Sequence, residues 1–271
     1  LSVSSAASDV YKRQGNTITQ VLEKEWGTKN DVYYPSFIRM SEDTYLIAYY
    51  GYNSGIKHDG TSVSNTWGQW LSVFQIKSDG SVINELGNFL HDTYTNSDPY
   101  NDLIKIDDDT YALAYKSYNY GPQTSGSWGG WIKTFKVNGG NINQVNELQH
   151  YTSSDSYWHS WERISATTYA LAWQGSGGDG YITTFTISTD GATITEISEL
   201  EHDGNNGSYN SFAKLDDDTY VLAYTGDGSD GHISTFTIPT NGASITKVAT
   251  LEHDNSYGIF NSLVRIDQNK F

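Results

Sequence analysis

The chain contains no cysteine, only four prolines and a single methionine among its 271 residues. Without cysteine there is no disulfide framework and no thiol chemistry, so the redox compartment stays open. Cations are also scarce, because 16 lysines and arginines stand against 32 aspartates and glutamates, leaving a formal charge of −16. A field of that sign repels phosphate backbones and anionic lipid, so neither nucleic acid nor a membrane surface is an expected partner.

Long apolar runs are missing as well. Stretches such as TYLIAYY fall far short of the roughly 18 to 20 residues that span a bilayer, so no membrane insertion is expected. The chain is nevertheless 37% hydrophobic and 14% aromatic, which is too apolar for disorder. Its many Ser, Thr, Asn, Gly and Tyr residues are typical of bacterial surface and secreted β-proteins. We therefore expect an extracellular or cell-surface location, although no signal peptide is visible.

The sequence does contain an internal repeat. An aromatic residue follows a polar turn at intervals of 66, 58, 51 and 51 residues, at Tyr45, Tyr111, Tyr169, Tyr220 and Phe271. Each copy holds four short runs with strand character, separated by turns that carry Gly, Pro, Asn and Asp. Four strands in a repeat of this length predict one blade of a β-propeller. The expected fold is all-β, built from four-stranded antiparallel blades.

The repeats divide one expected domain, 16–271, into four complete copies and two partial ones. The complete copies are about 29–92, 93–151, 152–203 and 204–254, and the partial blade strands are 16–28 and 255–271. We expect a fragment of a larger propeller that forms an open arc, whose apolar blade faces favour self-association. The alternative is a small ring sealed by pairing 16–28 with 255–266.

The first fourteen residues, LSVSSAASDVYKRQ, do not fit the repeat. They resemble a translated sequencing-adapter tail, so we expect a non-native or disordered segment that contributes nothing to the core. A genuine flexible arm is the other interpretation.

Over residues 16–271 the repeat resembles those of uncharacterised tandem-repeat β-propellers of environmental bacteria and archaea. The WD dipeptide is missing, but a histidine ends the fourth strand of each copy and is similar to the bracing histidine of WD-repeat propellers. These histidines are His91, His150, His202 and His253. The propeller resemblance implies that the loops joining strands two and three (B–C) and consecutive blades (D–A) share one face, where a rigid scaffold presents function.

The extra length of the first two copies lies in their B–C loops and brings in aromatic residues. Flat rings at a loop rim, among Asn, Gln and Asp, suit stacking on a sugar face. The candidate ligand-binding residues are Trp67, Trp70, Trp128, Trp131, Tyr52, Tyr118, Tyr120 and, in the third copy, Trp158. The alternative is that the tryptophan pairs anchor the inserts. Trp70 and Trp131 occupy the column of Tyr181 and His232, so their loss is expected to cost stability too.

The third copy departs from the repeat in a way that offers acid–base chemistry. His159 stands where the fourth copy has Asn210, and Glu162 stands where it has Ala213. A glycosidase needs two carboxylates beside the bond it cleaves, and Asp155 or Asp98 is a candidate for the second. No signature of a known propeller glycosidase or lyase is present, so no catalytic residue is expected.

Acidic loops and a basic column complete the candidates. Asp179, Asp227 and Asp230 lie in glycine-rich loops that resemble the Asp/Gly pattern of calcium loops, but neither loop has the complete ligand register, so no cofactor is expected.

A cation on the first strand of every copy is expected to pair from blade to blade, or to line a channel and bind an anion. These cations are Arg39, Lys105, Arg163, Lys214 and Arg265.

Together these features predict a non-enzymatic propeller that recognises a carbohydrate or surface polymer on the face with the B–C and D–A loops. The rival hypotheses are a glycoside hydrolase or lyase using Glu162, and a scaffold repeat of a larger surface protein.

Overall fold

The computed structural model describes residues 7–14, 17–25, 32–57, 59–93, 100–119 and 127–264. Sixteen of the strands in these ranges form four antiparallel sheets of four strands each. The first two sheets are β3 (Val32–Arg39), β4 (Thr44–Lys57), β5 (Ser62–Ile76), β6 (Ile83–Asp92), and β7 (Asp102–Lys105), β8 (Thr110–Asn119), β9 (Ser127–Asn138), β10 (Asn141–Tyr151). The last two are β11 (Tyr157–Arg163), β12 (Thr168–Gln174), β13 (Gly180–Ile187), β14 (Ile194–Asp203), and β15 (Ser208–Lys214), β16 (Thr219–Thr225), β17 (Gly231–Thr237), β18 (Thr246–Asp254). Two short 3-10 turns, η1 (Ser176–Gly178) and η2 (Asp227–Ser229), lie in B–C loops.

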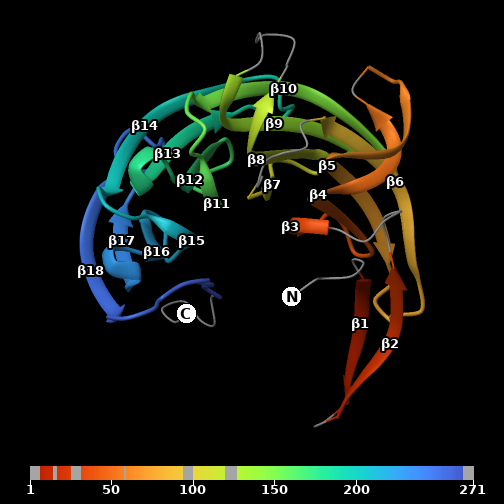
Figure 1. Cartoon of the computed structure of the whole chain (residues 1–271), viewed down its shortest axis with the longest axis horizontal. Coiled ribbons are helices and arrows are strands. Elements are labelled where there is room, and N and C mark those ends of the chain that lie inside the picture. The colour runs from red at the N-terminus through yellow and green to blue at the C-terminus, as the bar shows by residue number, and fades with distance from the viewer. Residues whose placement is uncertain are drawn as a thin grey trace.

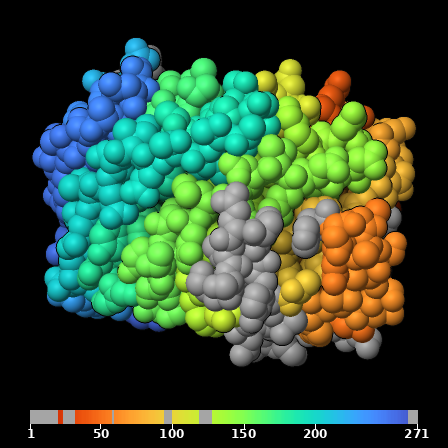
Figure 2. All heavy atoms as spheres, turned by 90° about the horizontal axis from the view of Figure 1, so that it is seen from above, coloured from red at the N-terminus to blue at the C-terminus, as the bar shows by residue number. Residues whose placement is uncertain are grey.

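The four sheets stand side by side in an arc, as the blades of a propeller do (Figure 1). In each blade the first strand lies nearest the centre and the fourth forms the outer rim. Seen from the side, the outer strands of neighbouring blades lie slanted against one another (Figure 2). The prediction of an all-β propeller is confirmed, and the described residues include no helix that is long and apolar enough to cross a membrane.

The second strand of each blade is buried because it lies between two neighbouring blades. Ala114 of β8 and Ala172 of β12 are fully buried. Ala114 belongs to the same apolar cluster as Trp173 and Phe185 of the next blade. A side chain no larger than a methyl group therefore leaves the space that a neighbouring aromatic ring fills, which gives the close packing typical of protein interiors.

One recurring hydrogen bond joins successive inner strands. A serine hydroxyl oxygen accepts the main-chain N–H of the following blade, from Ser36 to Leu103 (3.0 Å), Ser160 to Phe212 (3.0 Å) and Ser211 to Leu263 (2.8 Å). In the second blade Asp102 replaces the serine, and its carboxylate accepts the N–H of Trp161 at 2.7 Å. We call these four residues the inner-strand column.

The basic column also links one blade to the next. Its described members donate to main-chain carbonyls at the A–B corner of the preceding blade, Lys105 to Met40 (3.3 Å), Arg163 to Ile106 (2.8 Å) and Lys214 to Ile164 (2.9 Å). Arg39 bonds within its own turn, and Arg265 lies outside the described residues. The expected blade-to-blade pairing is therefore confirmed for these three cations.

The histidine column packs across the blade interfaces. Each ring meets an aromatic ring of the next blade edge-on, His91 on Tyr115 (5.0 Å), His150 on Trp173 (5.1 Å) and His202 on Tyr224 (4.8 Å between centroids). Their ring nitrogens have no hydrogen-bond partner in the described part of the chain. His253, at the same position of the last blade, is exposed. The column is therefore a packing element.

The segment before the first blade forms a hairpin. β1 (Ala7–Gln14) pairs antiparallel with β2 (Thr17–Glu25), and Leu22 packs against the apolar cluster that contains Tyr49 and Trp70 of the first blade. Residues 7–14 therefore differ from the expected unstructured tail, because β1 supplies main-chain partners to an edge of β2 that would otherwise be open. Deleting residues 1–14 would test whether they contribute to stability.

The arc stays open within the described residues. β2 pairs there with β1 and not with residues 255–264, so the alternative of a sealed ring is not formed. The hairpin and the C-terminal segment lie on opposite sides of the open end (Figure 1). Apolar side chains of the last blade are exposed, with Val248 at 60% and Leu251 at 64%. Self-association through this face stays a prediction.

Candidate functional site

One aromatic residue near the start of every inner strand has its backbone in the left-handed region. The residues and their φ angles are Tyr34 (51°), Tyr100 (46°), Trp158 (55°), Tyr209 (51°) and Phe260 (58°). Bulky L-residues rarely adopt this conformation, which costs on the order of 1–2 kcal/mol each. Strain of this kind persists where the surrounding structure imposes it, and it gathers at binding sites.

The five rings form a continuous row across the blades, which we call the aromatic arc. Centroids are 4.6 Å apart between Tyr34 and Tyr100, 4.3 Å between Tyr100 and Trp158, 3.8 Å between Trp158 and Tyr209, and 4.7 Å between Tyr209 and Phe260. Four of the rings are half-buried, and Phe260 is 72% exposed. The arc therefore keeps part of each ring open to solvent.

A β-bulge places three of the five arc residues, Tyr34, Trp158 and Tyr209. The pairing of the inner strand with its neighbour skips residues between Tyr33 and Ser36, Tyr157 and Ser160, and Ser208 and Ser211. Such a bulge bends the strand and turns a side chain in a new direction. The antiparallel register puts the arc at the same end of the blades as the B–C and D–A loops. In the third blade the start of the first strand, the end of the second, the start of the third and the end of the fourth are aligned there, at Tyr157, Gln174, Gly180 and Asp203.

The residues that follow Tyr100, Trp158 and Tyr209 brace the row. The side-chain amide of Asn101 donates to the carbonyl of Tyr34 (3.2 Å), and that of Asn210 donates to the carbonyl of Trp158 (3.2 Å). His159 takes this position in the third blade, with Nδ1 3.0 Å from the carbonyl oxygen of Tyr100. Each brace holds the arc carbonyl of the preceding blade.

His159 is thus engaged on both sides of its ring. Its Nε2 lies 2.9 Å from the Ser156 hydroxyl oxygen, and the side chain is buried. Burial lowers the pKa of His159 to about 4, so the imidazole is neutral near pH 7. The structure places this acid–base candidate in a bracing position.

Glu162 also serves the joint between blades. Its Oε1 accepts the N–H of Arg163 (2.9 Å) and its Oε2 accepts the N–H of Lys214 (3.2 Å). Burial raises the pKa of Glu162. Sequence reasoning did not single out Asp102 on the adjacent inner strand, where burial raises the pKa to about 7 and the charge of Glu162 adds to the effect. Both carboxyl groups hold main-chain donors of the next blade, which is the structural task of the serines elsewhere.

Asp155 lies beside the arc. Its Oδ1 accepts a hydrogen bond from the Tyr157 hydroxyl (3.2 Å), and its Oδ2 accepts one from the Ser176 hydroxyl (3.3 Å). The Tyr157 ring is 5.3 Å from that of Tyr100. Asp155 therefore joins a D–A loop to a B–C loop and places a carboxylate next to the aromatic row. Asp98, the other candidate for the second carboxylate, lies outside the described residues.

The first insert places one of its tryptophans in an aromatic cluster of the first blade. Trp67 is half-buried and contacts the rings of Tyr50 (5.4 Å) and Tyr52 (5.7 Å). The Tyr50 ring in turn lies 6.1 Å from that of Tyr33, the neighbour of Tyr34 in the chain. The cluster around Trp67 therefore ends at Tyr33, one residue before the arc in the chain.

The second insert is connected to the arc through a cation. Trp128 pairs across the strands with Tyr118, with 5.6 Å between ring centroids. The Lys116 ammonium lies over Trp128 (5.6 Å) and over Tyr157 (3.9 Å), and Tyr157 contacts the arc. Favourable contact of an ammonium with two ring faces holds this cluster together. Tyr120 lies outside the described residues.

Trp70 and Trp131 belong to the core. Their exposed fractions are 0% and 1%, and their indole N–H groups donate to the carbonyls of Gly51 (3.2 Å) and Ser117 (3.3 Å). A ring with no accessible surface cannot stack on a ligand. These two candidates therefore do not belong to the binding surface. Their rings pack in the core, as the expected loss of stability on removing them would require.

The aspartates proposed for Ca²⁺ serve their own loops. Asp227 Oδ1 accepts the N–H of Gly228 (2.9 Å), and Asp179 Oδ2 accepts the Tyr181 hydroxyl (3.5 Å). Asp230 follows η2 and caps its end through its main-chain N–H. In the part of the chain that the structure describes, no three His, Asp or Glu side chains are grouped to hold a metal ion.

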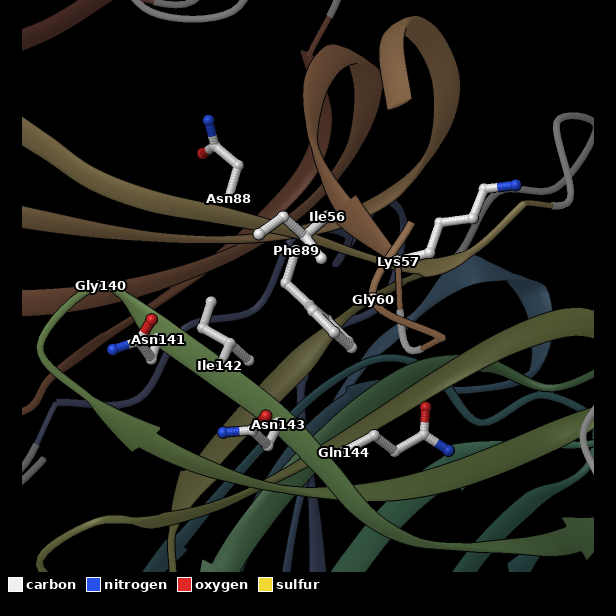
Figure 3. A pocket seen from close by; sticks show the side chains of 10 residues that line it. All are labelled: Ile56, Lys57, Gly60, Asn88, Phe89, Gly140, Asn141, Ile142, Asn143 and Gln144. Carbon is white, nitrogen blue, oxygen red and sulfur yellow. The ribbon is translucent and has the colours of Figure 1, made fainter. Parts of the chain in front are cut away.

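The tip of the first insert lies away from the arc, where it helps to form a cavity on the rim. Ile56 and Lys57 pair in parallel with β6, opposite Phe89 and Leu90. The cavity of about 200 Å³ lies between this tip and β10. Figure 3 shows the apolar side chains of Ile56, Phe89 and Ile142 gathered at its centre. The insert therefore divides its residues between the loop face and the rim.

Sequence reasoning included only Trp158 of the five arc residues. The signal was nevertheless present, because an aromatic residue stands five positions before the basic column in every copy. What the sequence did not reveal was the left-handed backbone that turns these rings toward one another.

No protein-family model matches the chain, and neither does any curated protein sequence. Among solved structures, a protein from Lactobacillus plantarum is similar with a TM-score of 0.51 at 12% identity, over 93% of this chain and 79% of that one. A Bacteroides uniformis protein provisionally assigned as a 6-phosphogluconolactonase gives 0.52 at 9% identity, over 96% and 81%. A hypothetical selenium-binding protein from Sulfolobus tokodaii gives 0.58 at 9% identity, over 92% and 57%. At these identities the likeness shows the fold alone.

Proposed function

We propose that the protein is a non-enzymatic binding propeller that recognises a glycan or cell-surface polymer along the aromatic arc. The observation that carries this proposal is the arc itself, five strained aromatic residues in a continuous row at the loop face. Stacking of sugar rings on such a row is of the order of 0.5–1.5 kcal/mol per ring pair if it resembles aromatic pairing. A row that crosses successive blades suits a chain of several units better than a single small molecule.

The two inserts support the same surface. Trp128 is linked to the arc through Lys116 and Tyr157, and the aromatic cluster around Trp67 ends at Tyr33, the chain neighbour of Tyr34. The candidate enzyme is less well supported, because Glu162 has both carboxyl oxygens engaged by main-chain N–H groups. For the scaffold alternative, the arc would join blades without binding anything.

The test begins with a glycan array on the whole chain, followed by calorimetric titration of any glycan that binds. Trp158→Ala removes the centre of the arc, and the Trp67→Ala/Trp128→Ala double variant removes the tryptophans of the inserts. Both should abolish or reduce binding at least tenfold. Phe37→Ala is the matched control, since Phe37 is 53% exposed and stacks on Tyr45 at the opposite end of the blade.

Unchanged affinity in Trp158→Ala, with a folded protein by circular dichroism, would show that the arc is not the binding surface. A reducing-sugar assay on each bound glycan separates binding from hydrolysis, and sugar release that is lost in Glu162→Gln would favour the enzyme instead.

A further inference from the structure

The charges around the arc restrict what it can bind, and this step rests on the function proposed above. The D–A and B–C loops that surround the arc carry Asp155, Asp179, Asp203, Asp227, Asp230 and Asp254. The cations of the inner strands lie at the opposite, A–B end, where they bond to corner carbonyls. The A–B turns carry carboxylates as well, among them 107–109 and 216–218, so the loop face differs from that end by its shortage of cations and not by a larger number of acidic groups.

Few cations offset these aspartates. In the described D–A and B–C loops the lysines are Lys57 and Lys116. Lys57 belongs to the insert tip that lines the rim cavity. Lys116 is buried and its ammonium lies 3.9 Å from the centre of the Tyr157 ring. Neither one is placed to receive an anionic group on the open surface of the arc.

Hydrogen bonds hold two of these acidic side chains in place, and one of them lies next to the arc. Asp155 accepts the hydroxyl of Tyr157, whose ring contacts Tyr100 of the arc. Asp254 accepts the N–H groups of Ser256 and Tyr257, and these bonds lower its pKa, so it remains charged near neutrality. Aromatic faces also attract cations through the ring quadrupole, so the rings and the carboxylates favour the same sign of ligand charge.

We infer that the polymer is an amino-sugar chain that bears free ammonium groups. Its sugar rings stack on the aromatic arc, and its ammonium groups lie among the loop carboxylates. Neutral chains of the same length bind by stacking alone, and chains of uronic acids are repelled. Because exposed charges are screened over about 8 Å at physiological ionic strength, the preference for the cationic chain weakens as salt is added.

The experiment compares three oligomers of equal length by calorimetry on the whole chain at about pH 6, a glucosamine hexamer, its fully N-acetylated form and a hexamer of uronic acid. We expect the cationic hexamer to bind about tenfold more tightly than the neutral one at low salt, with the advantage reduced at high salt. Asp155→Asn/Asp230→Asn should lower that advantage severalfold, read as the ratio of the cationic to the neutral affinity of the same variant. The control Asp108→Asn/Asp217→Asn removes the same charge from the A–B turns and should leave that ratio unchanged.

The outcomes separate the two proposals. Equal binding of the cationic and neutral hexamers, or tighter binding of the uronate, overturns the inference and leaves the proposed glycan binding standing. A loss of the cationic preference in the A–B control as large as in the loop variant also overturns it, since the effect would then be that of net charge. If none of the three hexamers binds, the inference is overturned, and the glycan array on the whole chain decides separately whether the proposed function stands.

Discussion

Acidification should destabilise this propeller through the histidines at its blade interfaces. His202 is the sharpest case, because its ring is buried on Tyr224 and Phe236 and its nitrogens have no hydrogen-bond partner in the described residues. Burial lowers the pKa of His202 to about 3, an effect that Asp203 opposes and Lys247 reinforces. The unfolded chain, with a pKa near 6.5, therefore takes up the proton first. Stability is complete above about pH 6.5 and falls as the pH decreases toward 3.

The size of the effect follows from the difference in proton binding. Between pH 7 and pH 5, a histidine that stays neutral in the folded state costs about 2 kcal/mol of unfolding free energy. His91, His150 and His159 are also buried with lowered pKa values, so each of them adds to the loss of stability in the same direction. Asp102 acts in the opposite sense, because its pKa of about 7 lets the folded state bind a proton before the unfolded chain does. Protonation of Asp102 therefore adds about 2 kcal/mol to the unfolding free energy between pH 7 and pH 5.

Urea unfolding at a series of pH values measures this directly. His202→Leu should flatten the fall between pH 7 and pH 5 by about 2 kcal/mol relative to wild type, whatever its own stability at pH 7. His253→Leu is the matched control, because His253 has the same position in the last blade but an exposed ring. Parallel pH profiles for wild type and His202→Leu would refute the reasoning, since they would mean that the imidazole is protonated as readily in the folded state as in the unfolded chain.

Three further outcomes are expected. Trp158→Gly should be more stable than Trp158→Ala by about 1 kcal/mol in urea unfolding, because glycine removes the cost of a φ of 55°, and the reverse order would argue against backbone strain. Trp131→Ala should lower the unfolding free energy by roughly 3–5 kcal/mol because the indole is fully buried, whereas Trp128→Ala at the surface should cost less than half as much. Asp102→Ser should bring the second blade into line with the others and raise stability at pH 7 by about 2 kcal/mol, since it removes a buried carboxylate whose pKa is raised. A loss of stability in Asp102→Ser would show that the serine cannot replace the carboxylate's bond to Trp161.

The sequence predicted the repeats, the strands and the blades because these depend on a local pattern of apolar and turn residues, and this pattern recurs in four complete copies. Sequence reasoning named Trp131 as a ligand-binding residue, which is wrong because the ring is buried, although the column of Trp131 had indicated a cost in stability. It did not predict the aromatic arc, because the contact between Trp158 and Tyr209 joins different copies. That contact also depends on a left-handed backbone angle, which an aromatic residue type does not indicate. The role of His159 was likewise hidden, since an imidazole and an asparagine look unlike in sequence but brace the same carbonyl in space.

Nor could the direction of the first insert be predicted. Its length suggested a loop above the face, whereas pairing of Ile56 with β6 directs the tip to the rim. Such pairing is decided by main-chain groups that every residue carries, so composition does not reveal it.

The inner-strand column determines how the loss of one hydrogen bond between blades affects the unfolding of the others. Each acceptor in the column holds the N–H of the next blade, so the coupling runs in series from one blade to its neighbour. In such a one-dimensional array an interior fault divides the molecule into two parts, while a fault near one end only releases that end. The same serine-to-alanine change should therefore weaken cooperativity more at Ser160 than at Ser211. The loss of cooperativity would then depend on the position of the blade in the row of four, although the two serines make the same hydrogen bond.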